Sequence, residues 1–367
     1  MMIDRRILAN IDWTILIVVL ALISVGIINL YSATSPVINS NTIPLFLRQT
    51  YWALIGLILI VIIIFIDYHL LERFAYPIYW FSITLLLLVL FIGREASGSQ
   101  RWLQIASFSF QPSELAKLAV IIALAKYFHK DQIPDGYLLK DLIPPVLITA
   151  LPIILIIKEP DLGTSAMFDL IAFTLFLFLK IRSISLSILA ATILVASPFL
   201  WRCLAEYQKR RIITFFNPSL DPLGDGYHIT QSKIAVGSGG FWGKGFLEGT
   251  QNQLRFLPEQ HTDFVFSVFA EEWGFLGSSI LLIILFFLII KGFDIAMQSR
   301  DKLGILLAFG IVTMFFWHII INIGMVIGIL PVVGAPLPFI SYGGSALVIN
   351  MAAVGILLNI HMRRFIF

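Results

Sequence analysis

The sequence predicts an all-α polytopic membrane protein with ten transmembrane helices and one large extracytoplasmic loop. Of its 367 residues, 59% are hydrophobic and only 13% are charged, whereas soluble domains contain about 45–50% apolar and about 25% charged residues. Ten apolar runs are long enough to cross a hydrocarbon core of about 30 Å as helices. One more polar segment separates the first seven runs from the last three.

The apolar runs give the order of the predicted spans. The first run is longer than the core of a usual signal peptide, so we interpret it as a retained span. An even number of spans places both termini on the same side of the membrane. The spans are residues 13–31, 50–66, 77–93, 113–128, 141–157, 162–179, 184–201, 264–290, 303–329 and 343–361.

Basic residues near the span ends indicate which side is cytoplasmic. Cytoplasmic segments of membrane proteins carry an excess of Lys and Arg. The short segments on the side away from the termini hold only Arg48, Arg94, Arg101 and Lys158. Both termini are therefore expected in the cytoplasm. The side with the termini holds Arg5, Arg6, Arg73, Lys126, Lys130, Lys140, Lys180, Arg182, Lys291, Arg300, Lys302, Arg363 and Arg364.

The long outer segment, residues 202–263, is expected to be ordered. It is far longer than a usual connection of about 4–6 residues, and it is rich in aromatic residues and glycines. Residues 229–236 are a candidate for a short amphipathic helix on the membrane surface. We expect residues 1–367 to form one integral membrane domain. The lone Cys203 cannot form an internal disulfide, and no basic patch with interleaved aromatics indicates nucleic acid.

Charged residues at or within spans need a partner or a function, because each costs about 2.5–3.5 kcal/mol at a helix centre. Glu114 and Lys117 share one face of the fourth span, either as a structural ion pair or as a ligand contact. Asp161 lies at the start of the sixth span, where it either caps the helix or contacts substrate. Trp102 is either an interfacial anchor or, beside Arg101, a platform for a sugar ring.

The last outer loop, residues 331–345, contains prolines and ends in Gly343, Gly344 and Ser345 at the start of the tenth span. Free N–H groups at a helix start suit an anion such as a phosphate. Glycine-rich helix packing is the alternative interpretation.

Asp263 is the candidate general base. It follows His261 at the outer rim of the eighth span, where it can reach water and a hydroxyl group. Glu271 and Glu272 are expected about 12 Å deeper in the span, at 1.5 Å per residue. As an isolated pattern, His-Thr-Asp is a weak signal.

Six ordered motifs together closely resemble the SEDS family (shape, elongation, division and sporulation) of bacterial membrane proteins. The resemblance covers most of the chain, and the last motif resembles the elongation members more than the division members. The only departure is local, since Lys158-Glu159 stands where an uncharged pair is familiar. The motifs are QRWL (100–103), QPSELAK (111–117), PDLGT (160–164), DPLGDGYHITQSKIAVGSGGFWGKGFLEGTQ (221–251), LPEQHTDFVFSVFAEEWG (257–274) and LPVVGAPLPFISYGGSAL (330–347).

The resemblance implies a peptidoglycan glycosyltransferase that polymerises lipid II on the outer face of the bacterial cytoplasmic membrane. It implies a class B penicillin-binding protein transpeptidase as a partner, together with other membrane proteins of the elongation complex. Asp263 matches the family's essential acid. Positions that matter in the family also include those of Trp102, Glu114, Lys117 and Asp161.

The implied substrate suggests roles for further residues. Its diphosphate needs cations and oriented donors, and its sugars need an aqueous rim with polar and aromatic side chains such as His261 and Tyr342. No closed set of metal ligands is evident, so a divalent cation (Mg²⁺ or Mn²⁺) would be held largely by the diphosphate. The candidates for the diphosphate are Arg48, Arg101, Lys117, Lys233 and the Gly343-Gly344-Ser345 helix start.

The simplest reaction is a single displacement with inversion, in which Asp263 accepts the proton of the acceptor N-acetylglucosamine 4-hydroxyl. Two other functions compete with this one. A lipid II flippase would line a path with polar residues from both faces, whereas the motifs here gather on the outer side. A non-catalytic scaffold for the transpeptidase would need no base.

Overall fold

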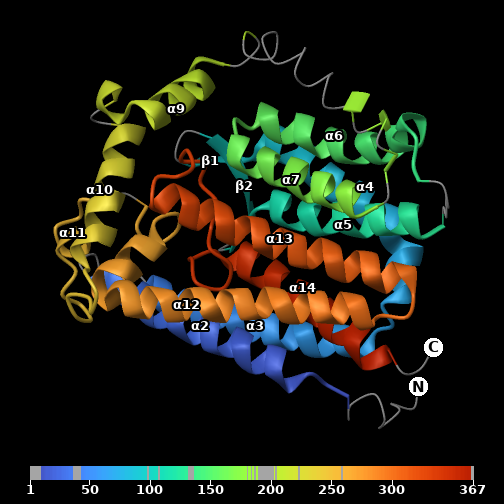
Figure 1. Ribbon diagram of the computed structural model, residues 1–367, viewed down its shortest axis with the longest axis horizontal. Coiled ribbons are helices and arrows are strands. Elements are labelled where there is room, and N and C mark those ends of the chain that lie inside the picture. Colours follow the sequence, from blue (N-terminus) through green and yellow to red (C-terminus); the bar gives the residue numbers. More distant parts are fainter. Residues whose placement is uncertain are drawn as a thin grey trace.

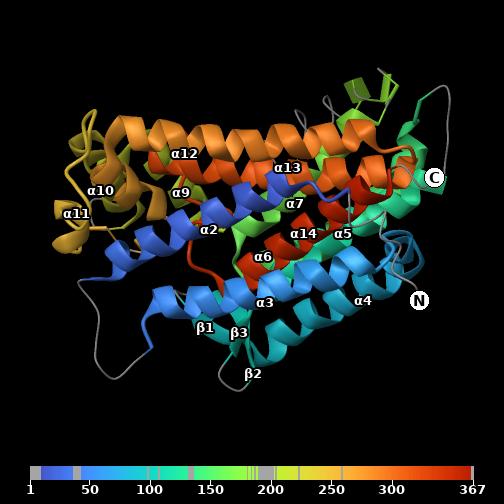
Figure 2. The same cartoon turned by 90° about the horizontal axis from the view of Figure 1, so that it is seen from below.

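The computed structural model is an elongated bundle of long helices (Figure 1). It describes residues 10–35, 43–96, 99–105, 108–130, 136–179, 181–182, 184–185, 187–188, 202, 205–221, 224–257 and 259–364. The start of α2 (Trp13–Thr34) and the end of α14 (Gly344–Arg363) lie at one end of the bundle. The opposite end holds α9 (Glu206–Phe216), α10 (Asp225–Ser238) and α11 (Thr250–Gln253), as Figures 1 and 2 show.

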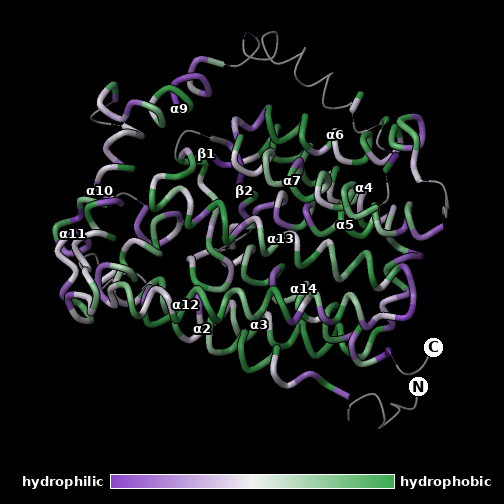
Figure 3. Tube along the Cα trace, viewed as in Figure 1, coloured by the Kyte–Doolittle hydropathy of each residue, from purple (hydrophilic) through white to green (hydrophobic). Residues whose placement is uncertain are grey.

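Seven described helices are long and apolar enough to cross a membrane, which confirms a polytopic helical membrane protein. Hydrophobic residues run along these helices and hydrophilic residues concentrate near their ends (Figure 3). The seven are α2, α3 (Leu45–Phe65), α4 (His69–Ile92), η2 (Leu139–Leu142) continued by α6 (Ile143–Lys158), α12 (Val265–Gln298), α13 (Lys302–Val326) and α14.

Two of the other predicted spans also coincide with helices. These are α5 (Pro112–Lys130), which carries several charges, and α7 (Leu162–Phe178), which is apolar but has only 17 residues. The predicted span 184–201 lies almost wholly outside the described residues. The count of ten spans therefore stays a prediction.

Helices α3 and α4 begin earlier than the apolar runs that predicted them, at Leu45 and His69 instead of residues 50 and 77. The run counts only apolar residues, but a helix continues into polar flanks where its backbone bonds persist. Arg48 and Gln49 therefore lie within α3, and Pro77 lies inside α4.

A small sheet corrects the all-α prediction. The segment between α4 and α5 forms three antiparallel strands, β1 (Arg94–Ala96), β2 (Ser99–Ile105) and β3 (Phe108–Phe110), in the order β1-β2-β3. Two of the strands have only three residues, too few for an alternating pattern to show in the sequence. The sheet places Arg101 and Trp102 on its central strand.

Helix α12 is broken at Gly274, which has φ 63° and ψ −162°. A helix break leaves main-chain N–H and C=O groups without intrahelical partners. The outer loop supplies these partners: Phe275 and Leu276 donate to the carbonyls of Gly240 and Phe241, at 2.9 and 3.1 Å. Lys244 and Gly245 donate to the carbonyls of Glu271 and Glu272, at 3.0 and 3.1 Å. The outer loop is therefore fastened to the kink by main-chain hydrogen bonds.

The break reverses the predicted depths along α12. Asn29 of α2 donates to the carbonyl of Val265 at 3.0 Å, whereas Ser32, nearer the end of α2, donates to Glu272. Glu271 accepts from Lys244 of the outer loop at 2.6 Å. Glu271 and Glu272 therefore lie nearer the outer loop than Val265 does, and the expectation that they are deeper than Asp263 is wrong.

A proline in α6 explains a hydrogen bond between helices. Pro152 has no N–H group, so the carbonyl of Ile148, four residues earlier, lacks its helical partner. The Tyr79 hydroxyl of α4 donates to that carbonyl at 2.9 Å. The bond ties α4 to α6 at the position where the α6 ladder is interrupted.

Tyr79→Phe should lower stability by about 1 kcal/mol, because a part-buried carbonyl that has no helical partner loses its donor. The measurement is the thermal unfolding midpoint in detergent. Tyr51→Phe is the control, because Tyr51 is exposed on α3. Equal midpoints for the two variants would contradict this account of the kink.

Candidate active site

The backbone around Asp263 is held by donors from two other segments. The side-chain amide of Asn322 in α13 donates to the carbonyl of Asp263 at 2.9 Å and to that of Ala335 at 2.7 Å. The Ser341 hydroxyl donates to the carbonyl of Thr262 at 2.6 Å. These bonds fix the position of Asp263 between α13 and the loop that leads to α14.

A glycine leaves room beside the Asp263 carboxylate. Gly334 has φ +73°, and a Cβ built at this position would lie 3.2 Å from Oδ2 of Asp263. Any other residue at position 334 would be strained at this φ and would crowd the carboxylate.

Burial, and after it the neighbouring carboxylate of Glu259, raises the pKa of Asp263 to about 7. Arg101 and Arg211 oppose this shift, and Asp161 adds to it. A general base works best when its pKa lies near the operating pH. The Asp263 carboxyl group therefore has the acidity that the proposed proton transfer needs.

His261 and Tyr342 contact each other near this part of the chain. The main-chain N–H of Tyr342 donates to the carbonyl of His261 at 2.9 Å, and their ring centroids are 6.1 Å apart. Burial lowers the pKa of His261, although Glu259 opposes the shift. His261 is therefore neutral at pH 7.

Asp161 caps a helix and braces an arginine. Its Oδ1 accepts from the main-chain N–H of Thr164 at 3.0 Å, and its Oδ2 accepts from the Thr164 hydroxyl at 2.8 Å. Arg101 Nε lies 3.2 Å from Oδ2, and Arg101 Nη2 donates to the carbonyl of Pro160 at 3.2 Å. The Asp161 side chain is only 3% exposed. This geometry favours the capping interpretation, while a substrate contact stays a prediction for Asp161 and for the half-buried Trp102.

Glu114 and Lys117 form a buried group with a histidine that the sequence interpretation did not include. Lys117 Nζ lies 2.8 Å from Oε1 of Glu114 and 2.8 Å from Nε2 of His318. His318 Nδ1 lies 2.8 Å from the carbonyl of Met314, which only accepts. Nδ1 therefore carries the hydrogen, and Nε2 accepts from the Lys117 ammonium. This geometry supports the ion-pair interpretation.

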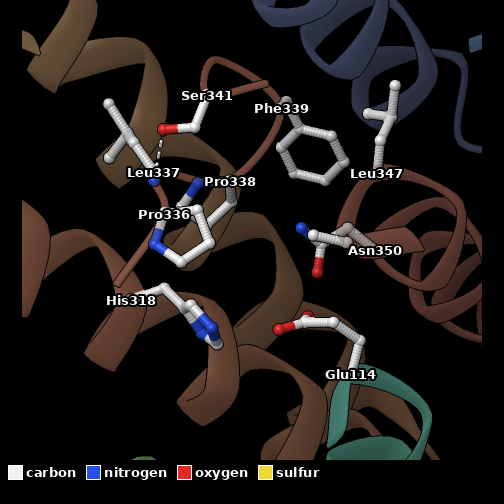
Figure 4. Close-up of a pocket in the computed structure, with 10 residues that line it drawn as sticks. Glu114, His318, Pro336, Leu337, Pro338, Phe339, Ser341, Leu347 and Asn350 are labelled. Carbon is white, nitrogen blue, oxygen red and sulfur yellow. Dashed lines mark hydrogen bonds between the residues drawn. The ribbon is translucent and has the colours of Figure 1, made fainter. Parts of the chain in front are cut away.

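A small cavity connects this group to the loop that holds Asp263. Glu114, His318 and Asn350 point into it from three helices, and the segment from Pro336 to Phe339 closes its other side (Figure 4). The Ser341 hydroxyl, which holds Thr262, accepts from the main-chain N–H of Leu337 at 2.8 Å. The buried charges therefore pack beneath the loop that positions the candidate base.

The glycine-rich start of α14 is used mostly for packing. A Cβ at Gly344 would lie 2.3 Å from the Trp52 indole. The Ser345 hydroxyl accepts from the main-chain N–H of Gln111 at 3.1 Å and lies 3.3 Å from the carbonyl of Ser109. The N–H of Gly343 faces Oε1 of Gln49 at 3.4 Å. The alternative of close helix packing therefore accounts for Gly344, and a phosphate site here stays a prediction.

The two remaining predicted cations are exposed. Arg48 lies on α3 beside Gln49. Lys233 lies on α10, with its aliphatic part over Gly328, where a Cβ would come within 1.9 Å of its Cε. Both remain predicted substrate contacts.

The sequence interpretation gave no role to Arg211 or Glu259, whose charges act on Asp263, or to Glu159, which lies near Asp161 and Arg101. Arg211 lies in the basic run of α9, and its charge acts on Asp263. Glu159 is 2% exposed, and its Oε1 has no hydrogen-bond partner. Burial raises the pKa of Glu159 to about 8, Asp161 adds to the shift, and Arg101 opposes it. Glu159 therefore keeps its proton at pH 7.

Glu159→Gln should remove a pH-dependent loss of stability. Because the folded state holds the proton up to about pH 8 and the free group releases it near 4.5, the wild-type free energy of unfolding should fall as pH rises through this window. The thermal midpoint should therefore fall more between pH 5 and pH 8 for wild type than for Glu159→Gln. Glu248→Gln is an exposed control. Parallel pH dependence in wild type and Glu159→Gln would contradict the buried, protonated state.

Comparisons with known proteins agree with the motifs. The family model of FtsW, RodA and SpoVE, described as a cell cycle protein, matches residues 12–365. Peptidoglycan glycosyltransferase MrdB of Escherichia coli K12 is 42% identical over 360 residues, which cover 97% of this chain and 94% of that protein. The fold is similar to that of a chain from a peptidoglycan synthase complex, in a structure on the coordination of polymerization and crosslinking. That match has a TM-score of 0.82 and 32% identity, and covers 97% and 98% of the two chains.

A second solved structure, the rod shape determining protein RodA of Thermus thermophilus, has a TM-score of 0.70 at 29% identity. The match covers 97% of this chain and 98% of that one. The similarity therefore extends over almost the full length in sequence and in fold.

Proposed function

The chain belongs to the FtsW, RodA and SpoVE family of cell cycle proteins, and from this membership we propose that Asp263 is the base with which it polymerises lipid II. The protein is a peptidoglycan glycosyltransferase, like its full-length curated relatives. One observation carries the proposal: a carboxyl group with a pKa of about 7 lies near two arginines, on a main chain that donors from two other segments hold in place.

The proposed reaction is a single displacement. The Asp263 carboxylate accepts the proton of the acceptor 4-hydroxyl while that oxygen forms a bond to C1 of the donor sugar. The bond from C1 to the diphosphate oxygen breaks, and the diphosphate leaves with the electron pair. Attack opposite the leaving group inverts the α linkage to β. A diphosphate is already a good leaving group, so the step needs no second carboxylic acid.

Positive charge near Asp263 suits the leaving diphosphate. Arg101 is held in place by Asp161 and by the carbonyl of Pro160, and the charge of Arg211 on α9 also acts on Asp263. Charge-assisted hydrogen bonds from arginine to phosphate oxygens are strong and directional. A divalent cation would come with the substrate, since no three His, Cys, Asp or Glu residues are grouped to hold one in the part of the chain that is described. That cation would neutralise charge on the diphosphate.

The proposal also includes a role in cell elongation and a class B penicillin-binding protein as the partner. Similarity to a chain of a synthase complex that joins polymerization with crosslinking supports a transpeptidase partner. Similarity to a rod shape determining protein supports a role in elongation. The distribution of Lys and Arg supports a site on the outer face of the cytoplasmic membrane.

A reconstituted assay tests the function. Purified protein in liposomes receives labelled lipid II, and glycan strands are separated by size while transport across the bilayer is measured in parallel. Polymer without transport is the expected result. Transport without polymer would support a flippase, and neither product, with the transpeptidase still bound, would support a scaffold.

A further inference from the structure

The outer loop contains an open pocket beside α9. It is bounded by α9, by η3 (Pro218–Leu220) and by Asp221, and its cavity volume is about 410 Å³. Small-molecule sites typically have about 300–1,000 Å³. The pocket therefore has room for part of a substrate.

The walls of this pocket carry both signs of charge. Lys209 and the exposed Arg210 supply positive charge, and Glu206 and Asp221 supply negative charge. Lys209 Nζ lies 3.2 Å from Oε1 of Glu206, whose side chain is 92% exposed. An exposed ion pair of this kind contributes little to stability, so its partners are available to a ligand at small cost.

Two exposed aliphatic side chains also line the pocket. Ile213 is 44% exposed and Leu220 is 62% exposed, and both line the pocket. Their exposure leaves apolar surface to be covered by small aliphatic groups of a ligand. A ligand that matches all three features carries carboxylates, an amino group and small apolar side chains. A short peptide has this chemistry, whereas an isolated sugar or diphosphate does not.

One helix, α9, connects the pocket with the proposed reaction centre. Arg211, whose charge acts on Asp263, directly follows Arg210 in α9. Helix α9 therefore carries both Arg211, whose charge acts on Asp263, and the neighbouring side chains that line the pocket. A substrate with sugars at Asp263 and a peptide attached to one sugar would extend in this direction.

We propose that the pocket formed by Glu206, Lys209, Arg210, Ile213, Leu220 and Asp221 binds the stem peptide of the lipid-linked disaccharide-pentapeptide. This inference rests on the proposed function and adds a peptide subsite to it. Lys209 and Arg210 bind carboxylates of the peptide, and Glu206 and Asp221 bind its amino group.

The test uses two lipid-linked disaccharides, one with the pentapeptide and one without it. The double variant Lys209→Gln/Arg210→Gln should raise KM at least tenfold for the peptide-bearing substrate and leave KM for the peptide-free one unchanged. Lys291→Gln, at the predicted cytoplasmic end of α12, is the control. Equal changes for both substrates, or none, would overturn the proposal.

A binding measurement separates this proposal from the proposed function. The soluble pentapeptide alone is titrated into the full-length protein in detergent, a readout that requires no turnover. Wild type should bind the peptide, and Lys209→Gln/Arg210→Gln should bind it at least tenfold more weakly. Glu206→Gln/Asp221→Asn should also weaken binding, and acetylation of the peptide amine should remove the difference between this second variant and wild type. Binding unaffected by either double variant would overturn the pocket assignment whether or not the protein polymerises lipid II.

Discussion

Asp263→Asn should abolish most polymerisation, with kcat falling about 10²–10⁴-fold, the usual contribution of a positioned base. Asparagine has nearly the same shape but accepts no proton from the sugar hydroxyl. The contacts that hold position 263 involve the main chain and remain in the variant. Binding of lipid II should therefore persist, and the loss should appear in kcat rather than KM.

The pH profile gives an independent measure of the same group. Because only the carboxylate accepts a proton, wild-type kcat/KM should rise with pH through about 7, the pKa of Asp263. Asp263→Asn should retain only a low rate without this rise. The matched control is Asp294→Asn, since Asp294 lies far along α12 and accepts an exposed hydrogen bond from Gln298 within the same helix. Normal turnover by Asp263→Asn would remove Asp263 as the base.

The stability of the same variant checks the burial of the carboxyl group. The folded protein favours the protonated form, so the wild-type free energy of unfolding should fall as pH rises from about 4 through about 7. A neutral asparagine has no such dependence. Asp263→Asn should therefore be at least as stable as wild type at pH 8 while it lacks activity, which separates loss of catalysis from loss of folding.

The sequence predicted the membrane class and most of the helices because long apolar runs leave few alternatives. It predicted Asp263 by position in a motif, but it could not predict the burial that raises its pKa or the residues that surround it. Asn322 and Gly334 lie far along the chain and carry no local signal for their proximity to Asp263. The depths of Glu271 and Glu272 were predicted wrongly, because a regular rise per residue assumes an unbroken helix. The break appears in the structure, in the dihedral angles of Gly274 and in the hydrogen bonds of the outer loop to residues on both sides of it.

For the charged residues near the span ends, the sequence indicated alternative roles but not which of them is correct. Asp161 was expected either to cap α7 or to contact substrate, and the sequence alone could not show that Thr164 and Arg101 occupy its oxygens. The spacing of Glu114 and Lys117 predicted their pairing. The third member, His318, comes from a helix two hundred residues later, so the pair appeared complete without it.

Lys117→Met should cause the largest loss of stability, about 3–5 kcal/mol, the usual cost of removing one partner of a buried ion pair. The Lys117 and Glu114 side chains are only 2% and 5% exposed. Without the ammonium, Glu114 would be left with an uncompensated charge and His318 with an unsatisfied Nε2. The measurements are the thermal midpoint in detergent and the yield of monodisperse protein.

The double variant Glu114→Gln/Lys117→Met should recover much of this stability, because it removes the buried negative charge together with the positive one. Its activity then distinguishes two roles for Lys117. If the buried group of Glu114, Lys117 and His318 only supports the loop next to Thr262 and Asp263, activity should return with the fold. If Lys117 also contacts the diphosphate, the double variant should fold but polymerise slowly, with a raised KM for lipid II. A Lys117→Met protein as stable as wild type would contradict the buried ion pair that both roles require.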